Sequence, residues 1–230
     1  MTREIVLDTE TTGLEPSEGH RLVEIGCLEL MNHIPTGKIF HTYLNPQRDV
    51  PPEAVRVHGL TEAFLKSHPL FTEKVDEFLT FIEGATLVIH NAEFDMKFIN
   101  AELKAAGFKG LPMDNVLDTL PIARQKFPGQ PANLDALCRR FKVDNSSRKF
   151  HGALLDAELL SEVYLELVGG RQHGLGLDAE AKAQSLALNA KIRRQKRPLR
   201  DFPPSPEELG AHEALLAKIK DSLWRRTGGG

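Results

Sequence analysis

The first 44 residues alternate between apolar and polar positions in a pattern that predicts β-strands. One apolar run covers residues 4–8 and ends at Thr11-Thr12-Gly13, a second stretch covers residues 21–32, and a third covers residues 38–44. Strands that follow one another with short connections are typical of an antiparallel meander. We therefore expect the first part of the chain to supply three neighbouring strands of one sheet.

After residue 50 the apolar positions change to helical spacing, interrupted by two short apolar runs. The expected helices cover residues 51–59, 72–82, 93–106, 120–125, 133–141 and 152–167. The expected strands cover residues 85–90 and 115–118. Strands that alternate with helices indicate parallel βα units. With the meander, this pattern predicts an α/β fold, a mixed sheet of about five strands flanked by helices.

Gly169-Gly170 ends the last of these helices, so residues 1–170 are expected to form one domain. Residues 171–230 are expected to form a tether rather than a second domain, because they offer a poor independent core. Near the end of the chain, Ser205 and Glu208 are spaced as a capping box at the start of a helix. Its predicted apolar stripe consists of Leu209, Leu215, Leu216, Ile219, Leu223 and Trp224.

Composition narrows the class of protein. Hydrophobic residues make up 41% of the 230 residues and charged residues 27%, which excludes a disordered, collagen-like or disulfide-stapled chain. No apolar run approaches the ~18 residues of a spanning helix. The two cysteines, Cys27 and Cys138, lie far apart without metal-site spacing. We expect a soluble protein of the reducing cytoplasm.

The net charge of −3 conceals an uneven distribution. Residues 1–170 hold 17 basic and 25 acidic side chains, whereas residues 171–230 hold 12 basic and 7 acidic ones. A basic tail on an acidic body is compatible with two interpretations, contact with nucleic acid or an acidic partner, and a solvated linker.

Three segments carry residues that could perform chemistry. Asp8 and Glu10 lie two positions apart on a strand, so their carboxylates project from the same face. Asp95 follows the strand at 85–90, in the first turn of a helix, where it could also serve the helix dipole. His151 is expected at the start of a helix, with Asp156 facing it from the first turns. Each residue alone could equally be an ordinary surface or capping group.

Taken in chain order, these segments match the three exonuclease motifs of the DEDD superfamily. The motifs are IVLDTETTG at residues 5–13, HNAEFD at residues 90–95 and HGALLD at residues 151–156. The histidine that opens the third motif identifies the DEDDh branch, and residues 4 to about 168 closely resemble the proofreading (epsilon) subunits of bacterial DNA polymerase III. The resemblance implies a ribonuclease H-like fold and a 3′-to-5′ exonuclease that releases 5′-mononucleotides from DNA 3′ ends.

Four acids in one cleft would resist ionising together unless cations neutralised them, and all-oxygen ligands select hard ions. We therefore expect two divalent cations, Mg²⁺ with Mn²⁺ as a substitute. The resemblance implies that Asp8 bridges both ions and that Glu10 and Asp156 hold the one that carries the nucleophilic water. Asp95 would act through bound water, and His151 would be the general base.

The resemblance also implies substrate and partner contacts. Thr11, Thr12, His58 and Phe94 would bind the terminal nucleotide. Gln172, Leu175 and Leu177 resemble a short sliding-clamp (beta) binding peptide, with chance similarity in a linker as the alternative. The final helix would dock on the polymerase (alpha) subunit. Two other functions stay open, a stand-alone DEDDh exonuclease acting on RNA or DNA ends and a non-catalytic nucleic-acid-binding module.

Overall fold

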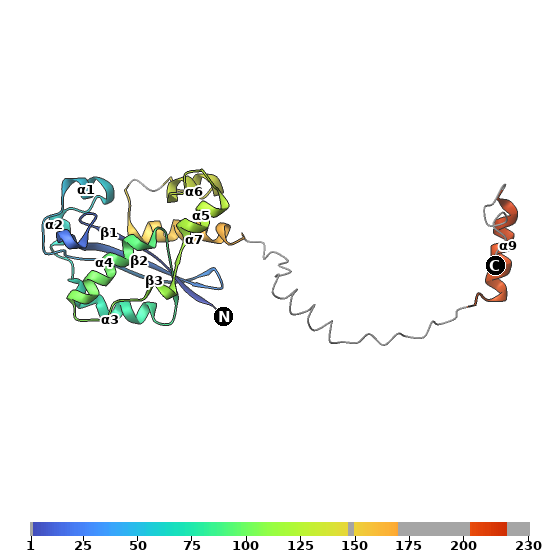
Figure 1. Ribbon diagram of the computed structural model, residues 1–230, viewed down its shortest axis with the longest axis horizontal. Coiled ribbons are helices and arrows are strands. Elements are labelled where there is room, and N and C mark those ends of the chain that lie inside the picture. The colour runs from blue at the N-terminus through green and yellow to red at the C-terminus, as the bar shows by residue number, and fades with distance from the viewer. Residues whose placement is uncertain (1, 147–149, 170–202, 220–230) are drawn as a thin grey trace. The chain divides into compact units, whose positions relative to one another are not determined.

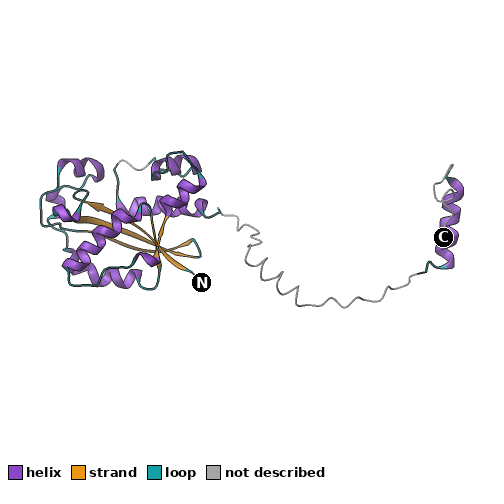
Figure 2. Cartoon of the chain, in the orientation of Figure 1, coloured by secondary structure: helices purple, strands orange, loops and turns teal. Residues whose placement is uncertain are grey.

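The computed structural model describes residues 2–146, 150–169 and 203–219, and the chain divides into two compact units, Met1–Leu175 and Gly176–Gly230. The strands are β1 (Arg3–Thr11), β2 (Leu22–Met31), β3 (Ile34–Tyr43), β4 (Thr86–Ile89) and β5 (Val116–Asp118). The helices are α1 (Pro52–His58), α2 (Glu62–Leu65), α3 (Phe71–Ile82), α4 (Ala92–Ala105), α5 (Thr119–Lys126), α6 (Leu134–Phe141), α7 (Ala153–Leu167) and α9 (Pro206–Lys218) (Figures 1 and 2).

The five strands form one mixed sheet in the order β3-β2-β1-β4-β5. β1 pairs antiparallel with β2, and β2 with β3, whereas β1 with β4 and β4 with β5 pair in parallel. The predicted meander followed by βα units is therefore confirmed. The third strand begins at Ile34 rather than residue 38, because Asn32 and His33 both adopt positive φ values, 51° and 67°, and turn the chain at once.

The sheet has two covered faces, as the alternation of β1 requires. Ile5 and Leu7 point into a core formed with α3 and α4. Val6 points to the other face, where it packs with Ala157 and Leu160 of α7. Beyond α7, the helices α5 and α6 complete a third apolar cluster (Figure 1). Even-numbered residues of β1 consequently face α7, and odd-numbered ones face α4.

The first strand has the expected end, and several short elements are additional. β1 continues to Thr11, so Asp8 and Glu10 lie on the strand near its carboxyl end, as expected, although a register shift interrupts the pairing with β2 after Glu10. The short helix α2 and two 3-10 turns, Pro16–Glu18 and Met113–Asn115, were not expected. Elements of three or four residues are too short to show a hydrophobic period.

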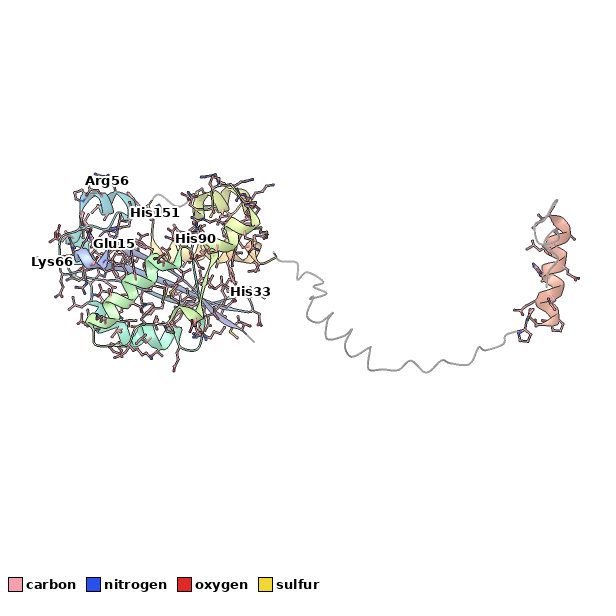
Figure 3. The ribbon with its side chains drawn as sticks, viewed as in Figure 1. Glu15, His33, Arg56, Lys66, His90 and His151 are labelled. Carbon is pink, nitrogen blue, oxygen red and sulfur yellow. The ribbon has the colours of Figure 1, made fainter. Side chains whose placement is uncertain are left out.

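Helix α7 is anchored to the first residues of β1 through a buried carboxylate. The Tyr164 hydroxyl donates to Glu4 Oε1 at 2.7 Å, and His33 Nδ1 lies 2.9 Å from Glu4 Oε2. Burial and the Glu4 carboxylate raise the pKa of Tyr164, which keeps the hydroxyl protonated as a donor. Figure 3 shows His33 well away from His151, so this contact fixes the end of α7 opposite to the one that follows His151.

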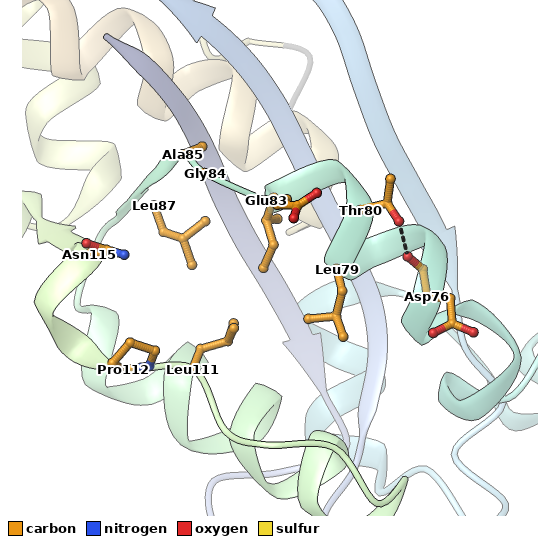
Figure 4. A pocket seen from close by; sticks show the side chains of 11 residues that line it. Asp76, Leu79, Thr80, Glu83, Gly84, Ala85, Leu87, Leu111, Pro112 and Asn115 are labelled. Carbon is orange, nitrogen blue, oxygen red and sulfur yellow. Dashed lines mark hydrogen bonds between the residues drawn. The ribbon is translucent and has the colours of Figure 1, made fainter.

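An open groove of about 440 Å³ lies between α3 and the segment that precedes β5 (Figure 4). Leu79, Leu87 and Leu111 contribute apolar surface to it. None of the predicted site residues lines this groove. Among the described residues, no helix is both long and apolar enough to cross a lipid bilayer.

The second unit contains the predicted capped helix, α9. Ser205 Oγ accepts from the backbone N–H of Glu208 at 3.2 Å, and Glu208 Oε2 accepts from the backbone N–H of Ser205 at 2.8 Å, which confirms the capping box. Leu209 and Leu215 are exposed on it. Ile219, expected on the same stripe, instead follows the helix as an extended C-cap residue, because α9 ends at Lys218. Residues 171–177, with the predicted clamp peptide, lie outside the described residues, as do Leu223 and Trp224.

The other end of α7 lies against β2 at Gly26. A Cβ atom at position 26 would lie 2.3 Å from the carbonyl carbon of Ala153 and from the backbone nitrogen of Leu154. Gly26 is also the partner of Asp8 in the β1–β2 ladder. The missing side chain therefore lets the first turn of α7 approach the strand that carries the predicted acids.

We expect Gly26→Ala to lower the free energy of unfolding by about 3 kcal/mol or more, because the added methyl group meets backbone atoms that cannot move aside. Urea denaturation followed by circular dichroism measures this loss. Gly152→Ala is the matched control, since nothing lies within 4 Å of its Cβ and a changed N-cap costs only about 1 kcal/mol. Equal losses in the two variants would contradict the proposed steric role.

Candidate active site

Three of the predicted site residues come together at the carboxyl end of β1. Glu10, His151 and Asp156 each offer one ligand atom, and these atoms all lie within 4.8 Å of one another. Glu10 comes from β1, Asp156 from the first turn of α7, and His151 from the segment before that helix. Residues separated by more than 140 positions in sequence thus form one cluster.

His151 is positioned by a backbone hydrogen bond to α1 and by a contact between its ring and Asp156. Gly152 is the extended N-cap of α7, so His151 precedes the helix, as predicted. Its backbone N–H donates to the Val57 carbonyl oxygen at 3.0 Å, which ties this segment to α1. The ring Nδ1 lies 3.2 Å from Asp156 Oδ2; the histidine side chain is 48% exposed and the aspartate side chain only 4%. The pair thus joins a buried carboxylate to a solvent-accessible base.

Asp8 lies on the same face of β1 as Glu10, opposite Gly26. It is not part of the three-residue cluster of possible ligands, in which His151 accompanies Glu10 and Asp156 instead. The structure therefore groups the predicted general base, rather than Asp8, with the two carboxylates. Burial raises the pKa of the Cys27 thiol, and the nearby negative charge of Asp8 makes a smaller contribution in the same direction.

Asp95 lies on the opposite face of the sheet, and it is not part of the cluster of possible ligands or of the groove lining. It lies in the first turn of α4 and is 4% exposed. The hydroxyl of Thr9, an odd-numbered residue of β1, donates to Asp95 Oδ1 at 2.7 Å. Burial and, more weakly, the charge of Asp118 raise the pKa of Asp95, hydrogen bonds from Thr9 and from backbone N–H groups oppose the shift, and the resulting pKa is about 7. Burial thus makes the charged carboxylate costly when no cation is near.

A groove of about 510 Å³ opens beside these residues. Thr11, Thr12, His58 and Phe94, the four predicted substrate-binding residues, all line it together with Glu10. The remaining lining residues are Gly13, Leu14, Glu18, His20, Pro51, Glu53, Ala54 and Val57. A groove that begins at the possible metal ligands and continues along apolar and hydroxyl side chains can hold one end of a strand against the acids.

His58 offers a buried donor to this groove. The residue is 5% exposed, and its Nδ1 accepts the backbone N–H of Leu60 at 3.0 Å. Burial lowers the pKa of His58, although the Thr11 backbone and the charge of Glu24 oppose the shift. The neutral ring therefore carries its proton on Nε2, a buried atom without a hydrogen-bond partner of good geometry.

Sequence reasoning missed His20 and Thr9. His20 packs against Gly13 and its Nδ1 lies 3.1 Å from the Thr12 hydroxyl, but it comes from an irregular polar loop that has no motif. Thr9 could have been found, because strand alternation places it on the face opposite Asp8 and Glu10.

The cluster fits a divalent cation. Two carboxylates and an imidazole converge within a few ångströms, and Asp8 adds a further oxygen donor on the same strand face. Oxygen-rich sites select hard cations over softer ones. A cation nearby would also favour the charged form of Asp95, whose pKa is raised chiefly by burial.

Residues 5–164 match the family model described as Exonuclease. The chain is 51% identical over 221 residues to the DNA polymerase III subunit epsilon of Rickettsia felis, covering 94% of this chain and 96% of that protein. It is 45% identical over 240 residues to the Escherichia coli (strain K12) protein of the same name, covering 98% of each. The chain belongs to the DNA polymerase III subunit epsilon family. The predicted family is confirmed, and this epsilon-family chain is a 3′–5′ proofreading exonuclease.

Solved structures show the same fold. The nuclease domain of 3′hExo, a DEDDh family member bound to rAMP, has a TM-score of 0.62 at 16% identity, covering 72% of this chain and 91% of that one. Exonuclease X in complex with 5′ overhanging duplex DNA has a TM-score of 0.56 at 22% identity, covering 72% and 90%. The ribonuclease H-like fold expected of an epsilon-family chain is confirmed.

We expect Asp95→Asn to stabilise the metal-free protein at pH 8 by about 1 to 3 kcal/mol and to have little effect at pH 4. The folded chain holds the Asp95 proton more tightly than the unfolded chain does. The resulting stability is present below the unfolded-state pKa of about 4 and is lost as the pH rises through the folded-state pKa of about 7. The side chain that Asp95→Asn introduces does not ionise, so the variant does not lose stability as the pH rises.

Urea denaturation in chelator at several pH values measures the effect. Asp76→Asn, an exposed substitution on α3, is the control and should show no such pH-dependent gain. If Asp95→Asn and Asp76→Asn change stability equally at pH 8, Asp95 does not titrate as described.

Proposed function

We propose that Asp8, Glu10, Asp95, His151 and Asp156 hydrolyse the phosphodiester bond at DNA 3′ ends and release 5′-mononucleotides. The observation that carries this proposal is the convergence of ligand atoms from Glu10, His151 and Asp156 within 4.8 Å, at one end of the substrate groove. Acids and a base that meet beside a groove can bring a water molecule and a phosphate together.

We infer that Asp8, Glu10 and Asp156 hold two divalent cations, Mg²⁺ with Mn²⁺ as a substitute. Bound cations of this kind lower the pKa of a coordinated water and stabilise the departing oxygen. Asp8 would add its carboxylate from β1 to those of Glu10 and Asp156, and the buried Asp156 would be fixed in direction by the first turn of α7. Asp95, held by Thr9, supports the site through water.

His151 is assigned as the general base rather than as a ligand. Nδ1 lies 3.2 Å from Asp156 Oδ2, so an N–H at that nitrogen would orient the ring toward the carboxylate and leave Nε2 to take the proton of the attacking water. Half-exposure of the ring lets that proton pass on to solvent. A metal-bound imidazole could not accept a proton at the same nitrogen.

The groove residues would hold the terminal nucleotide. His58 Nε2–H would donate to it, since burial keeps this group in need of an acceptor. Phe94 would stack on a base, an interaction of about 1 to 3 kcal/mol. Thr11 and Thr12 would offer backbone and hydroxyl groups at the end of β1.

We expect His151→Ala to lower turnover by about 10² to 10⁴ with the fold intact, because a positioned base contributes about that factor. Asp8→Ala should abolish metal-dependent cleavage. The assay is digestion of matched single-stranded DNA, RNA and 3′-mispaired duplex DNA with and without Mg²⁺. His212→Ala and Asp76→Ala are the controls, on the second unit and on α3. Near-wild-type rates in either site variant would refute the assignment, and preference for RNA would favour the RNA-trimming alternative.

The relatives named DNA polymerase III subunit epsilon suggest a larger assembly. We propose that α9 docks on the polymerase (alpha) subunit and that Gln172, Leu175 and Leu177 bind the sliding clamp (beta). In support, α9 exposes leucines to solvent, and an exposed apolar stripe on an amphipathic helix suits a groove in a partner. Residues 171–230 would thus tether residues 1–170, the exonuclease domain, to the cytoplasmic replication machinery.

We expect Leu209→Ala with Leu216→Ala to abolish co-purification of the full chain with the polymerase subunit and to leave its cleavage of single-stranded DNA unchanged. Alanine keeps the helix propensity and removes the apolar contact. Glu207→Ala with Glu213→Ala, exposed positions on the same helix, is the matched control. Unchanged co-purification in the leucine variant would show that α9 is not the docking element.

A further inference from the structure

Asp118 connects the two parallel βα junctions beside the active site. It is the last residue of β5 and pairs with Ile89, the last residue of β4. Because β4 and β5 run in parallel, both chains leave the sheet at the same level. The first enters α4, which carries Asp95, and the second enters α5.

The Asp118 carboxylate accepts backbone N–H groups from both junctions. Oδ1 accepts from Asn91 at 2.9 Å and from Leu120 at 2.9 Å, and Oδ2 accepts from Ala92 at 3.2 Å. One side chain thus serves the first N–H groups of α4 as well as those of its own helix, α5.

Helix α4 has no N-cap side chain of its own. Asn91 occupies the N-cap position with φ 65° and ψ 53°, a left-handed conformation, and its side chain makes no capping hydrogen bond. Such a conformation costs free energy in a residue other than glycine and persists where surrounding contacts hold it. The Asp118 carboxylate supplies such contacts.

A second hydrogen-bonded link joins the same junctions. The hydroxyl of Thr119, a fully buried residue, donates to the Ile89 carbonyl oxygen at 3.3 Å and lies 2.8 Å from His90 Nδ1. The chain from Ile89 to Ala92 is therefore held to β5 and α5 at several successive residues. Asp95 lies in the first turn of the same helix, three residues after Ala92.

We propose that Asp118 is a positioning residue for Asp95, fixing the start of α4 so that the Asp95 carboxylate meets Thr9 and the metal site. Thr9 holds Asp95 from β1 and Asp118 holds its helix from β5. This inference rests on the role of Asp95 in the proposed function. Asp118 itself contacts neither substrate nor cation in this assignment.

The experiment compares Asp118→Ala, Asp118→Asn and a matched control in the full chain. Asn133→Ala is that control, because Asn133 Oδ1 caps α6 by accepting from Ala136 at 2.8 Å and neither residue belongs to the site. Three quantities are measured: kcat and KM on single-stranded DNA, the dissociation constant of Mn²⁺ alone by calorimetry, and amide hydrogen exchange at Asn91 and Ala92.

Asp118→Ala should lower kcat by about 10- to 100-fold with KM changed less than about threefold, as expected for a catalytic group displaced by roughly an ångström. It should also weaken Mn²⁺ binding several-fold and speed exchange at Asn91 and Ala92. Asn133→Ala should leave all of these unchanged. Asp118→Asn should recover most of kcat and Mn²⁺ affinity, since the amide oxygen can still accept from Asn91 and Leu120.

Three results would overturn the inference. The first is an Asp118→Ala variant whose kcat and Mn²⁺ affinity equal those of Asn133→Ala. The second is an Asp118→Asn variant as impaired as Asp118→Ala, which would assign the effect to charge rather than to position. The third is unchanged exchange at Asn91 and Ala92. Absence of metal-dependent cleavage by the unsubstituted chain would instead refute the proposed function, and the exchange data would still decide whether Asp118 holds α4.

Discussion

The active site depends on the contact between the first turn of α7 and strand β2 at Gly26. Asp156 and His151 belong to the end of the exonuclease domain, whereas Asp8 and Glu10 belong to its first strand. The two groups meet because backbone can lie on backbone where position 26 has no Cβ. At its other end, α7 is fixed to β1 by the Tyr164–Glu4 hydrogen bond. Because α7 is held at both ends, the position of its first turn, which carries Asp156, is fixed relative to β1.

Electrostatics opposes the arrangement that packing imposes. Carboxylates from β1 and α7 meet on one face of the sheet and Asp95 of α4 lies on the other, and burial makes the charged form of a carboxylate costly. The raised pKa of Asp95 records this cost. Hydrogen bonds from Thr9 and from backbone N–H groups limit the cost in the protein alone, and divalent cations would offset the remainder. The packing of β1, α4 and α7 thus positions the carboxylates for cations, and the same burial makes their charged forms costly when no cation is bound.

The sequence predicted most of the sheet, the long helices and the motif residues. Strands such as 21–32 and helices such as 152–167 are long enough to show a period, and the three motifs are read directly from their residues. The third strand begins four residues before the expected start at residue 38, and α2 was not predicted. Tight turns and single helical turns are too short to show a hydrophobic period. The face on which Thr9 lies follows from strand alternation and could have been predicted. His20 and Asp118 escaped because their roles come from side chains that meet across elements. Such contacts are a property of the register and packing, which local sequence does not contain.

Strand β1 serves the site from both sides, with Asp8 and Glu10 toward α7 and Thr9 toward α4. Which residue faces which helix is therefore decided by odd or even position alone. Inserting or deleting a single residue within β1 ahead of Asp8 would exchange the two sets, turning acids toward the apolar α3–α4 core and a hydroxyl toward the cations. A change in the length of the loops around this strand would leave the two faces as they are, whereas inserting or deleting an odd number of residues inside it would reverse them.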